Sequence, residues 1–371
     1  LYDIVVTLTE GVTPSLVLTD LIPAGLRLDM SFGGGAGYQL LTTSGQTGSL
    51  LFNFNGAVVI GSVGAASGAL GDDGADPRFV FSSAQVVGDN DTTNNSFVIR
   101  VRLVASNTTG NQAGTVRANS AQVSYSDLDG DTPNGAAAIT RDVALTGGAP
   151  SITVREPTLQ VTQTLVTPPG LGFDEGDPVE WTITISNGSS TTNDFDAFDV
   201  TFLNNLPTQL STLVLVSVVD QNGGDLSSNF VLDTATGQLR TVAGANIDIL
   251  RGGSITLRLT GVVNASAAAG VVIPNTATVQ WTSLNGATGP PAVPAGERTG
   301  VDGLLGSGAL NDYRFSNTLN IPVAAGVRFS RVGGLGDTTA PVPTDADFEN
   351  VTVGEIIRYR AAVLVPEGVT P

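Results

Sequence analysis

The stretch from residue 174 to residue 207 limits the possible folds of this chain more than any other. Its apolar side chains at Val179, Trp181, Ile183 and Ile185 alternate with polar ones. This period of two is typical of a β-strand with one buried and one solvated face. A Gly-Asp pair precedes the strand and an Asn-Gly pair ends it, as expected for turns. The stretch therefore predicts a strand at the edge of a hydrophobic core, and the chain repeats the pattern.

A duplication relates two large parts of the sequence. Apolar strand positions recur 156 residues apart without a gap, and Asn119 recurs as Asn275 and Tyr125 as Trp281. The other matched pairs are Ile99 and Ile255, Val101 and Leu257, Arg102 and Arg258, Leu103 and Leu259, Gly114 and Gly270, Val123 and Val279, and Gly130 and Gly286. Positions predicted to face inward match other inward positions, which is expected for a repeated fold.

The end of the chain repeats earlier segments. Gly354–Tyr359 resembles the turn and strand at Gly176–Trp181, and the last five residues, 367–371, are identical to Glu10–Pro14. Tyr359 then corresponds to Tyr2. We therefore expect the chain to end in the same strand with which it begins.

The composition excludes several kinds of chemistry. The chain has no Cys and no His, and all of its 16 positive charges are Arg, because it contains no Lys. Disulfides, cysteine metal sites and histidine bases are therefore absent. Catalysis through a lysine Schiff base and phosphate binding by a P-loop lysine are excluded for the same reason.

The charge of the chain limits its partners. With 34 acidic and 16 basic residues, the net charge is −18, so nucleic acid and anionic membrane surfaces are unfavourable partners, whereas cations are plausible. No run of 18 apolar residues is present, so we expect no membrane insertion by this segment. Charged residues make up only 13% of the chain, and Ser, Thr, Asn and Gly are abundant, which favours a secreted β-protein.

Three motifs resemble a known family. They are the Gly176–Asn187 turn and strand, the Leu16–Leu26 strand with its Pro-Ala-Gly turn and its relative at Val200–Leu210, and the strands Asn119–Tyr125 and Asn275–Trp281. Together they resemble the conserved repeat domain of bacterial and archaeal surface proteins known as domain of unknown function eleven, and its fimbrial relatives. The resemblance implies an extracellular immunoglobulin-like β-sandwich arranged in tandem. Some fimbrial relatives form a Lys–Asn isopeptide crosslink, which is excluded here because this chain lacks Lys.

Acidic loops offer candidate metal ligands. Asp127, Asp129 and Asp131 alternate around Gly130, and alternate carboxylates in a turn can converge on Ca²⁺. The alternative is a solvated turn, since the second repeat has no acids at the equivalent positions. Weaker candidates are Asp72/Asp73/Asp76, Asp89/Asp91, Asp194/Asp196/Asp199 and Asp345/Asp347/Glu349.

An enzymatic function is not expected. Two carboxylates alone suffice for glycoside hydrolysis, but no group of aromatic residues is available for sugar stacking. Both Trp residues, Trp181 and Trp281, fall on inward strand positions and are predicted to lie in the core. We therefore predict no catalytic residues and no cofactor other than the candidate Ca²⁺.

The sequence predicts an all-β protein of tandem immunoglobulin-like β-sandwiches. Module one spans 1–150 and lacks its first strand segment, module two spans 151–326, and residues 327–371 are the opening strands of a further module. The expected function is structural: a repeat unit of an extracellular filament, stalk or giant cell-surface protein. The alternative is a surface adhesin that binds a ligand through its loops.

Assembly is expected to be head to tail between copies of this unit. A 327–371 segment would complete module one of the next copy, either as a strand donated by a separate subunit or within one longer polypeptide. The overlap between residues 2–14 and 359–371 favours the longer polypeptide, because both stretches belong in the same place in a sheet.

Overall fold

The structure is a computed structural model of the 371-residue chain. It describes residues 1–42, 57–64, 67–68, 70–127, 139–167, 169–286, 297–324, 326–331 and 359–364. Over these residues the chain is all-β: it contains antiparallel strands and three short 3-10 turns, η1 (Phe32–Gly34), η2 (Thr92–Asn94) and η3 (Ser227–Asn229), and no α-helix. None of the described helices is long and apolar enough to span a membrane.

Module one contains two main sheets. One has the strand order β1-β9-β5 and the other β13-β12-β3-β7, with smaller pairings β2-β8-β6, β10-β4 and β11-β14 beside them. The strands are β1 (Tyr2–Thr7), β2 (Gly11–Val12), β3 (Val17–Leu21), β4 (Leu26–Leu28), β5 (Tyr38–Leu41), β6 (Val58–Ile60), β7 (Arg78–Val80), β8 (Ala84–Val86), β9 (Ser96–Val101), β10 (Leu103–Ala105), β11 (Val116–Ala118), β12 (Ser120–Asp127), β13 (Ile139–Ala144) and β14 (Ser151–Thr153).

Module two is a sandwich of two larger sheets. A four-stranded sheet, β15-β16-β21-β18, faces a five-stranded sheet, β19-β20-β17-β22-β23. The strands are β15 (Leu159–Leu165), β16 (Pro178–Asn187), β17 (Phe198–Asn205), β18 (Leu210–Asp220), β19 (Phe230–Asp233), β20 (Gln238–Thr241), β21 (Ser254–Val263), β22 (Val272–Thr282) and β23 (Arg314–Pro322). The alternation that the sequence shows in β16 appears as alternating buried and half-buried residues along the strand.

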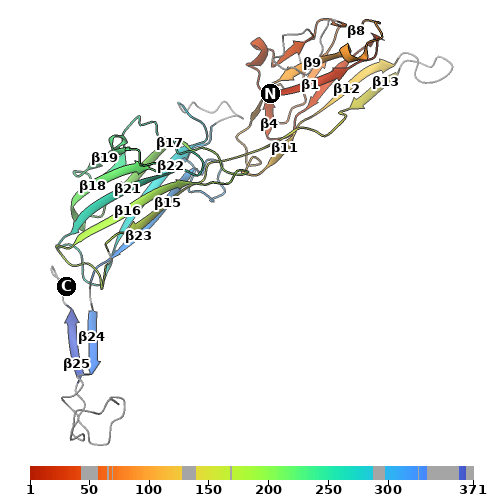
Figure 1. Ribbon diagram of the computed structural model, residues 1–371. Helices are drawn as coiled ribbons and strands as arrows, with labels where there is room; N and C mark the ends of the chain where they lie inside the picture. The colour runs from red at the N-terminus through yellow and green to blue at the C-terminus, as the bar shows by residue number, and fades with distance from the viewer. Residues whose placement is uncertain are drawn as a thin grey trace, which may run out of the picture.

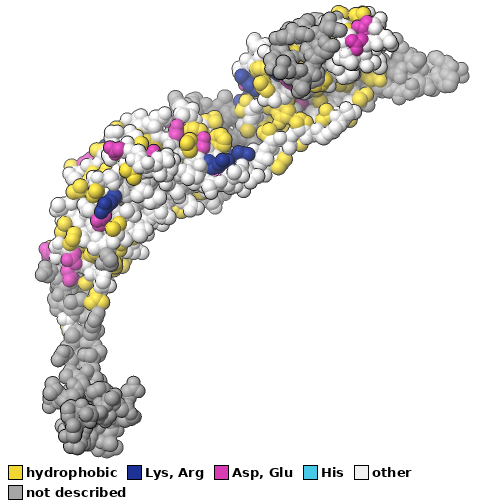
Figure 2. All heavy atoms as spheres, in the orientation of Figure 1, with side chains coloured by type: hydrophobic (Ala, Val, Ile, Leu, Met, Phe, Trp, Pro, Cys, Tyr) yellow, Lys and Arg dark blue, Asp and Glu magenta, His cyan; other side chains and the backbone are white. Residues whose placement is uncertain are grey.

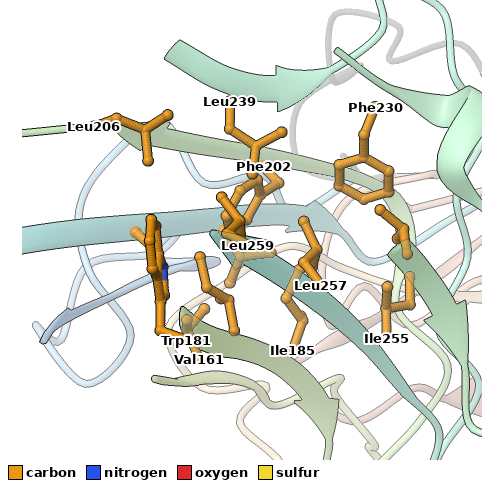
Figure 3. Packing of buried hydrophobic residues seen from close by; sticks show 14 of the residues in the cluster. Val161, Trp181, Ile185, Phe202, Leu206, Phe230, Leu239, Ile255, Leu257 and Leu259 are labelled. Carbon is orange, nitrogen blue, oxygen red and sulfur yellow. The ribbon is translucent and has the colours of Figure 1, made fainter. Parts of the chain in front are cut away.

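Each module has its own hydrophobic core. One cluster of buried side chains draws on residues between Ile4 and Ala121, and the other on residues between Leu159 and Val323. The prediction for the tryptophans is confirmed, since Trp181 and Trp281 are both 0% exposed. Figure 3 shows Trp181 among the aliphatic side chains that the two sheets of module two direct toward each other. The two cores lie on either side of residue 150, and the module limits stay predictions.

The strand pairing shows how the two modules correspond. Tyr2 pairs with Val101 in module one, and Ile183 pairs with Leu257 in module two. Val101 and Leu257 are equivalent in the duplication, so Tyr2 corresponds to Ile183. The sequence comparison through Gly176–Trp181 placed this match two residues earlier. The difference arises because the Gly176-Asp177 turn resembles Gly354-Glu355 more closely than the strands after these two turns resemble each other.

One strand of module two, β15, has no counterpart among the described residues of module one. β16 lies between β15 and β21, whereas β1, the counterpart of β16, pairs only with β9 among the described residues. β1 is therefore an edge strand whose outer side is open in this part of the chain.

A further hairpin follows module two. β24 (Gly326–Arg331) pairs antiparallel with β25 (Tyr359–Leu364), and Arg331 lies opposite Tyr359. In Figure 1 this hairpin extends from the end of module two that lies away from module one, so the chain is elongated. The pairing of β24 with β25 has the same antiparallel arrangement as that of β15 with β16.

Candidate functional site

A buried polar cluster lies between the two sheets of module two. Gln163 on β15 donates from Nε2 to the carbonyl oxygens of Asn275 and Asn317 at 3.0 and 2.8 Å. Asn275 Nδ2 donates to Gln163 Oε1, and Asn204 Nδ2 donates to Asn275 Oδ1, both at 2.8 Å. Asn204 and Asn275 are each 0% exposed. The edge strand β15 therefore supplies the amide that closes an uncharged hydrogen-bond network.

Module one has the same cluster with a different chemistry. Asp20 pairs with Ala121 as Asn204 pairs with Ala277, and the two alanines are equivalent in the duplication. Asp20 therefore occupies the position of Asn204. Asn119, the equivalent of Asn275, donates from Nδ2 to Asp20 Oδ1 at 2.8 Å. An acid replaces an amide at the centre of the cluster.

The module-one cluster contains three polar groups without hydrogen-bond partners. Asp20 Oδ2, Asn119 Oδ1 and the Tyr2 hydroxyl are buried without a hydrogen-bond partner. Burial raises the pKa of Asp20 to about 7, against the lowering effect of the Asn119 hydrogen bond, and the charge of Asp76 raises it further. Burial and the nearby Asp20 also raise the pKa of Tyr2. Buried polar groups are nearly always paired, so three unpaired groups on one cluster make it a candidate for a further hydrogen-bond partner.

The open edge of β1 corresponds to the edge of β16 that β15 covers in module two. The Leu8 amide donates to Asn95 O at 3.0 Å, and hydrogen-bonded pairs alternate along antiparallel strands. The amides of Asp3, Val5 and Thr7 consequently point away from β9, toward the open side. In module two the corresponding side of β16 is covered by β15, the strand that carries Gln163. In the part of the chain that the structure describes, the unpaired backbone edge and the unpaired polar cluster both occur where module two has β15.

The second candidate site is the junction between the modules. Glu156, just after β14, forms a salt bridge from Oε1 to Arg298 Nη1, and the same oxygen accepts the Tyr313 hydroxyl at 2.9 Å. The other carboxylate oxygen accepts the Ala113 amide at 2.7 Å. Burial raises the pKa of the Tyr313 hydroxyl well above its ordinary value, and Glu156 adds to this effect. Glu156 therefore joins a loop of module one to the end of module two.

Arg298 binds the same loop of module one. Its Nη2 donates to the carbonyl oxygens of Thr108 and Asn111 at 2.8 and 2.7 Å, and its Nε donates to Asn107 Oδ1 at 3.1 Å. The residue is 6% exposed, so its charge is held by protein groups rather than by water. Tyr313 stacks on Trp281 with ring centroids 5.5 Å apart, which links the junction to the core of module two. The modules are thus connected by buried polar contacts rather than by a simple linker.

The predicted metal residues are only partly visible. Asp127 is the last residue of β12, and Asp129 and Asp131 lie outside the described residues, as do Asp345, Asp347 and Glu349. The described residues contain no group of three acidic side chains positioned to hold a metal ion. Several of the other candidate acids accept hydrogen bonds from backbone amides. Asp91 accepts from Thr93 in its own loop, whereas Asp73 accepts from Gly25 and Asp196 from Arg251, both in loops distant in sequence.

Neither polar site was predicted from the sequence. Asn119 and Asn275 were matched by the duplication, but the residues that meet them come from β3, β15 and β17. The signal that would have identified the cluster is a polar residue at an inward strand position. Asp20 lies in a strand whose other inward residues are apolar, and Gln163 follows Leu159 and Val161 on the inward face of β15.

Comparisons with known proteins give structural similarity only. No protein-family model and no curated protein matches the chain, so the resemblance to domain of unknown function eleven stays a prediction. Among solved structures, the chain is similar to the fimbrial adhesin FimA of Actinomyces, with 13% identity and a TM-score of 0.28, covering 46% of this chain and 58% of that one. It is also similar to a C-terminal fragment of the major pilin GBS80 of Streptococcus agalactiae (9%, 0.27, 49% and 60%). A third similar structure is the full-length major pilin SpaD of Corynebacterium diphtheriae (9%, 0.30, 90% and 69%).

The chain matches less than two thirds of the FimA and GBS80 structures. The fold assignment rests on the sheets and cores described above.

Proposed function

We propose that this chain is a structural repeat unit of an extracellular filament, stalk or giant cell-surface protein. In this proposal, module one of each unit is completed by a β24-type strand of a neighbouring unit. The observation that carries it is the open edge of β1 together with the hairpin β24–β25 at the other end of the molecule. An open sheet edge is a template for an added strand, and strand addition is a common way to join protein units.

The surface and composition support a structural role. Charged side chains are sparse on the face that Figure 2 shows, as expected for a chain in which only 13% of residues are charged. The buried contacts of Glu156 and Arg298 hold one module against the next, which suits a unit that transmits force along its length. We infer a mechanical role rather than an enzymatic one, in a secreted and fimbria-like assembly.

The repeat of β1 at the end of the chain favours units connected in one polypeptide. β25 contains Tyr359, the counterpart of Tyr2 in β1, so β24–β25 is the pairing that a completed module one would contain. If separate subunits donated β24, either β25 or β1 would be displaced, leaving apolar residues without a partner. In a continuous chain each of the two strands belongs to its own module.

Immunogold electron microscopy on the native cell surface tests this function. Antibodies against the purified chain are expected to label a filament or stalk repeatedly along its length. Label confined to the tips of surface structures would favour the alternative, an adhesin that binds through its loops. Label inside cells would contradict both. Denaturing electrophoresis of the native material separates the two connectivities, because separate subunits of this length would run near 37.7 kDa.

A further inference from the structure

We propose that Arg331 of a β24-type strand from a second copy of this unit enters the Asp20–Asn119–Tyr2 cluster of module one. We further propose that this arginine determines which strand completes which module. The inference rests on the proposed completion of module one and adds the residue that makes the completion specific.

The strand register places Arg331 at this position. Gln163 lies opposite Ile183, and Arg331 lies opposite Tyr359. Tyr359 corresponds to Tyr2, and Tyr2 corresponds to Ile183 through the paired strands β9 and β21. Arg331 therefore holds the register position of Gln163, the residue that closes the cluster in module two.

The sequences of β24 and β15 agree with this register. Leu159, Val161 and Gln163 share the inward face of β15. Val327, Phe329 and Arg331 follow the same pattern in β24, with two apolar residues and then a polar one. By the two-residue period of a strand, the register positions of Val327, Phe329 and Arg331 share one face of β24, and that of Arg328 belongs to the other.

The unpaired oxygens of the cluster in module one fit a cation with several donors. Asp20 Oδ2, Asn119 Oδ1 and the Tyr2 hydroxyl are buried without a partner, and each of the three oxygens can accept a hydrogen bond. A guanidinium group has five N–H donors and a permanent charge, and its bonds to a carboxylate are stronger than uncharged ones. The side chain of Arg is longer than that of Gln, which already spans the equivalent distance in module two. An arginine at this position would satisfy both the acceptors and the charge.

The two clusters differ both at the position of Gln163 and at the position of Asn204. In module two, Gln163 and Asn204 are two uncharged amides that both bond to Asn275. The completed module one would instead combine Arg331 with Asp20, two opposite charges. An arginine strand in module two would bury a charge without a counter-ion, and a glutamine strand in module one would leave the Asp20 carboxylate without a cation. A buried charge without its partner is strongly destabilising. Opposite charges therefore favour a β24-type strand in module one, and uncharged amides favour β15 in module two.

The test uses an extended chain, in which a second copy of residues 326–357 precedes Leu1 of the full chain, so that Leu1 takes the place of Arg358. Both Trp residues lie in module two, so the unfolding of module one is followed by pulsed hydrogen exchange of β9 in increasing urea. The variants in the added strand are Arg331→Gln and, as a matched control on the opposite face, Arg328→Gln. Asp20→Asn is combined with Arg331→Gln to recreate the uncharged set of module two.

The proposal predicts how the urea midpoint of module one changes in each chain. The extension raises the urea midpoint of module one, Arg331→Gln removes most of that gain, and Arg328→Gln keeps it. Asp20→Asn alone also loses the gain, while the double variant recovers at least half of it. If Arg331→Gln keeps the gain, or the double variant recovers nothing, the role of Arg331 is overturned while strand completion stands. If the extension gives no gain at all, strand completion itself fails, and with it the basis of the proposed function.

Discussion

Asp20 and Asn204 occupy the same position in the two modules, and each is hydrogen-bonded to the equivalent asparagine, Asn119 or Asn275. The exchange of an amide for an acid makes the core of module one sensitive to pH. In module two the same position is uncharged at every pH, and its hydrogen bonds are complete through Gln163.

The stability of module one is predicted to fall as the pH rises from about 4 to about 7. The pKa of Asp20 is raised to about 7 by burial, so in this range the folded state binds a proton that the unfolded state has released. Rising pH therefore favours the unfolded state until both states are ionised above about pH 7. The effect is at most on the order of 4 kcal/mol.

Urea titrations of the unextended chain at pH 4.5 and pH 8 measure this effect. Asp20→Asn is the control, because it removes the titrating group and keeps the hydrogen bond to Asn119. The expected result is a loss of module-one stability at pH 8 in the natural chain that is much smaller in the variant. Equal pH dependence in both chains would show that Asp20 is ionised in the folded state at both pH values.

The junction between the modules is predicted to loosen when its buried ion pair is broken. Glu156→Gln leaves the guanidinium of Arg298, 6% exposed, without its counter-ion, and breaking a buried pair costs about 3–5 kcal/mol. Small-angle X-ray scattering should then show a wider distribution of distances between the modules. The matched control is Glu180→Gln, which breaks the pair with Arg258, an exposed pair of little energetic value. Identical scattering from both variants would contradict the role of Glu156.

The tryptophans are predicted to be essential to the core of module two. Replacing Trp281 by Ala removes a 0% exposed side chain that stacks on Tyr313, and should cost about 3–5 kcal/mol. Trp181→Ala should cost a similar amount. Urea unfolding monitored by circular dichroism measures the loss, with the exposed Val216→Ala as control. An indole that is freely quenched by iodide in the folded chain would contradict the burial of either tryptophan.

The sequence predicted those parts of the structure that depend on local patterns. Alternation along β16 and β21 predicted their strands and the burial of both tryptophans, since period two is decided by neighbouring residues alone. The duplication predicted that Asn119 and Asn275 are equivalent. The partners of these asparagines come from strands distant in sequence, and only the cross-strand register identifies them.

The junction could not be predicted for a related reason. Glu156 and Arg298 are 142 residues apart, and neither lies in a motif that the other helps to define. Their contact depends on how two folded modules dock, which no local pattern encodes. The same limit explains the two-residue difference in the match of Tyr2, because turn residues such as Gly176 and Asp177 suggested one alignment and strand pairing determined another.

Calcium binding at Asp127, Asp129 and Asp131 stays a prediction. If the three carboxylates converge on Ca²⁺, isothermal titration calorimetry should detect heat, and a chelator should lower the melting temperature of the chain. The variant Asp129→Asn should remove both effects, whereas Asp91→Asn, in a loop where the carboxylate caps Thr93, should leave the calcium heat unchanged. No heat and unchanged melting in chelator would exclude the site.

The most direct test of the central claim is residue-resolved hydrogen exchange of β1, measured by NMR in the natural and the extended chain. If a β24-type strand completes module one, the amides of Asp3, Val5 and Thr7, which point to the open edge, should exchange at least tenfold more slowly in the extended chain. Amides that already bond to β9, such as that of Val6, should gain only the general increase in stability. Unchanged exchange at Asp3, Val5 and Thr7 would contradict the completion of module one by this strand.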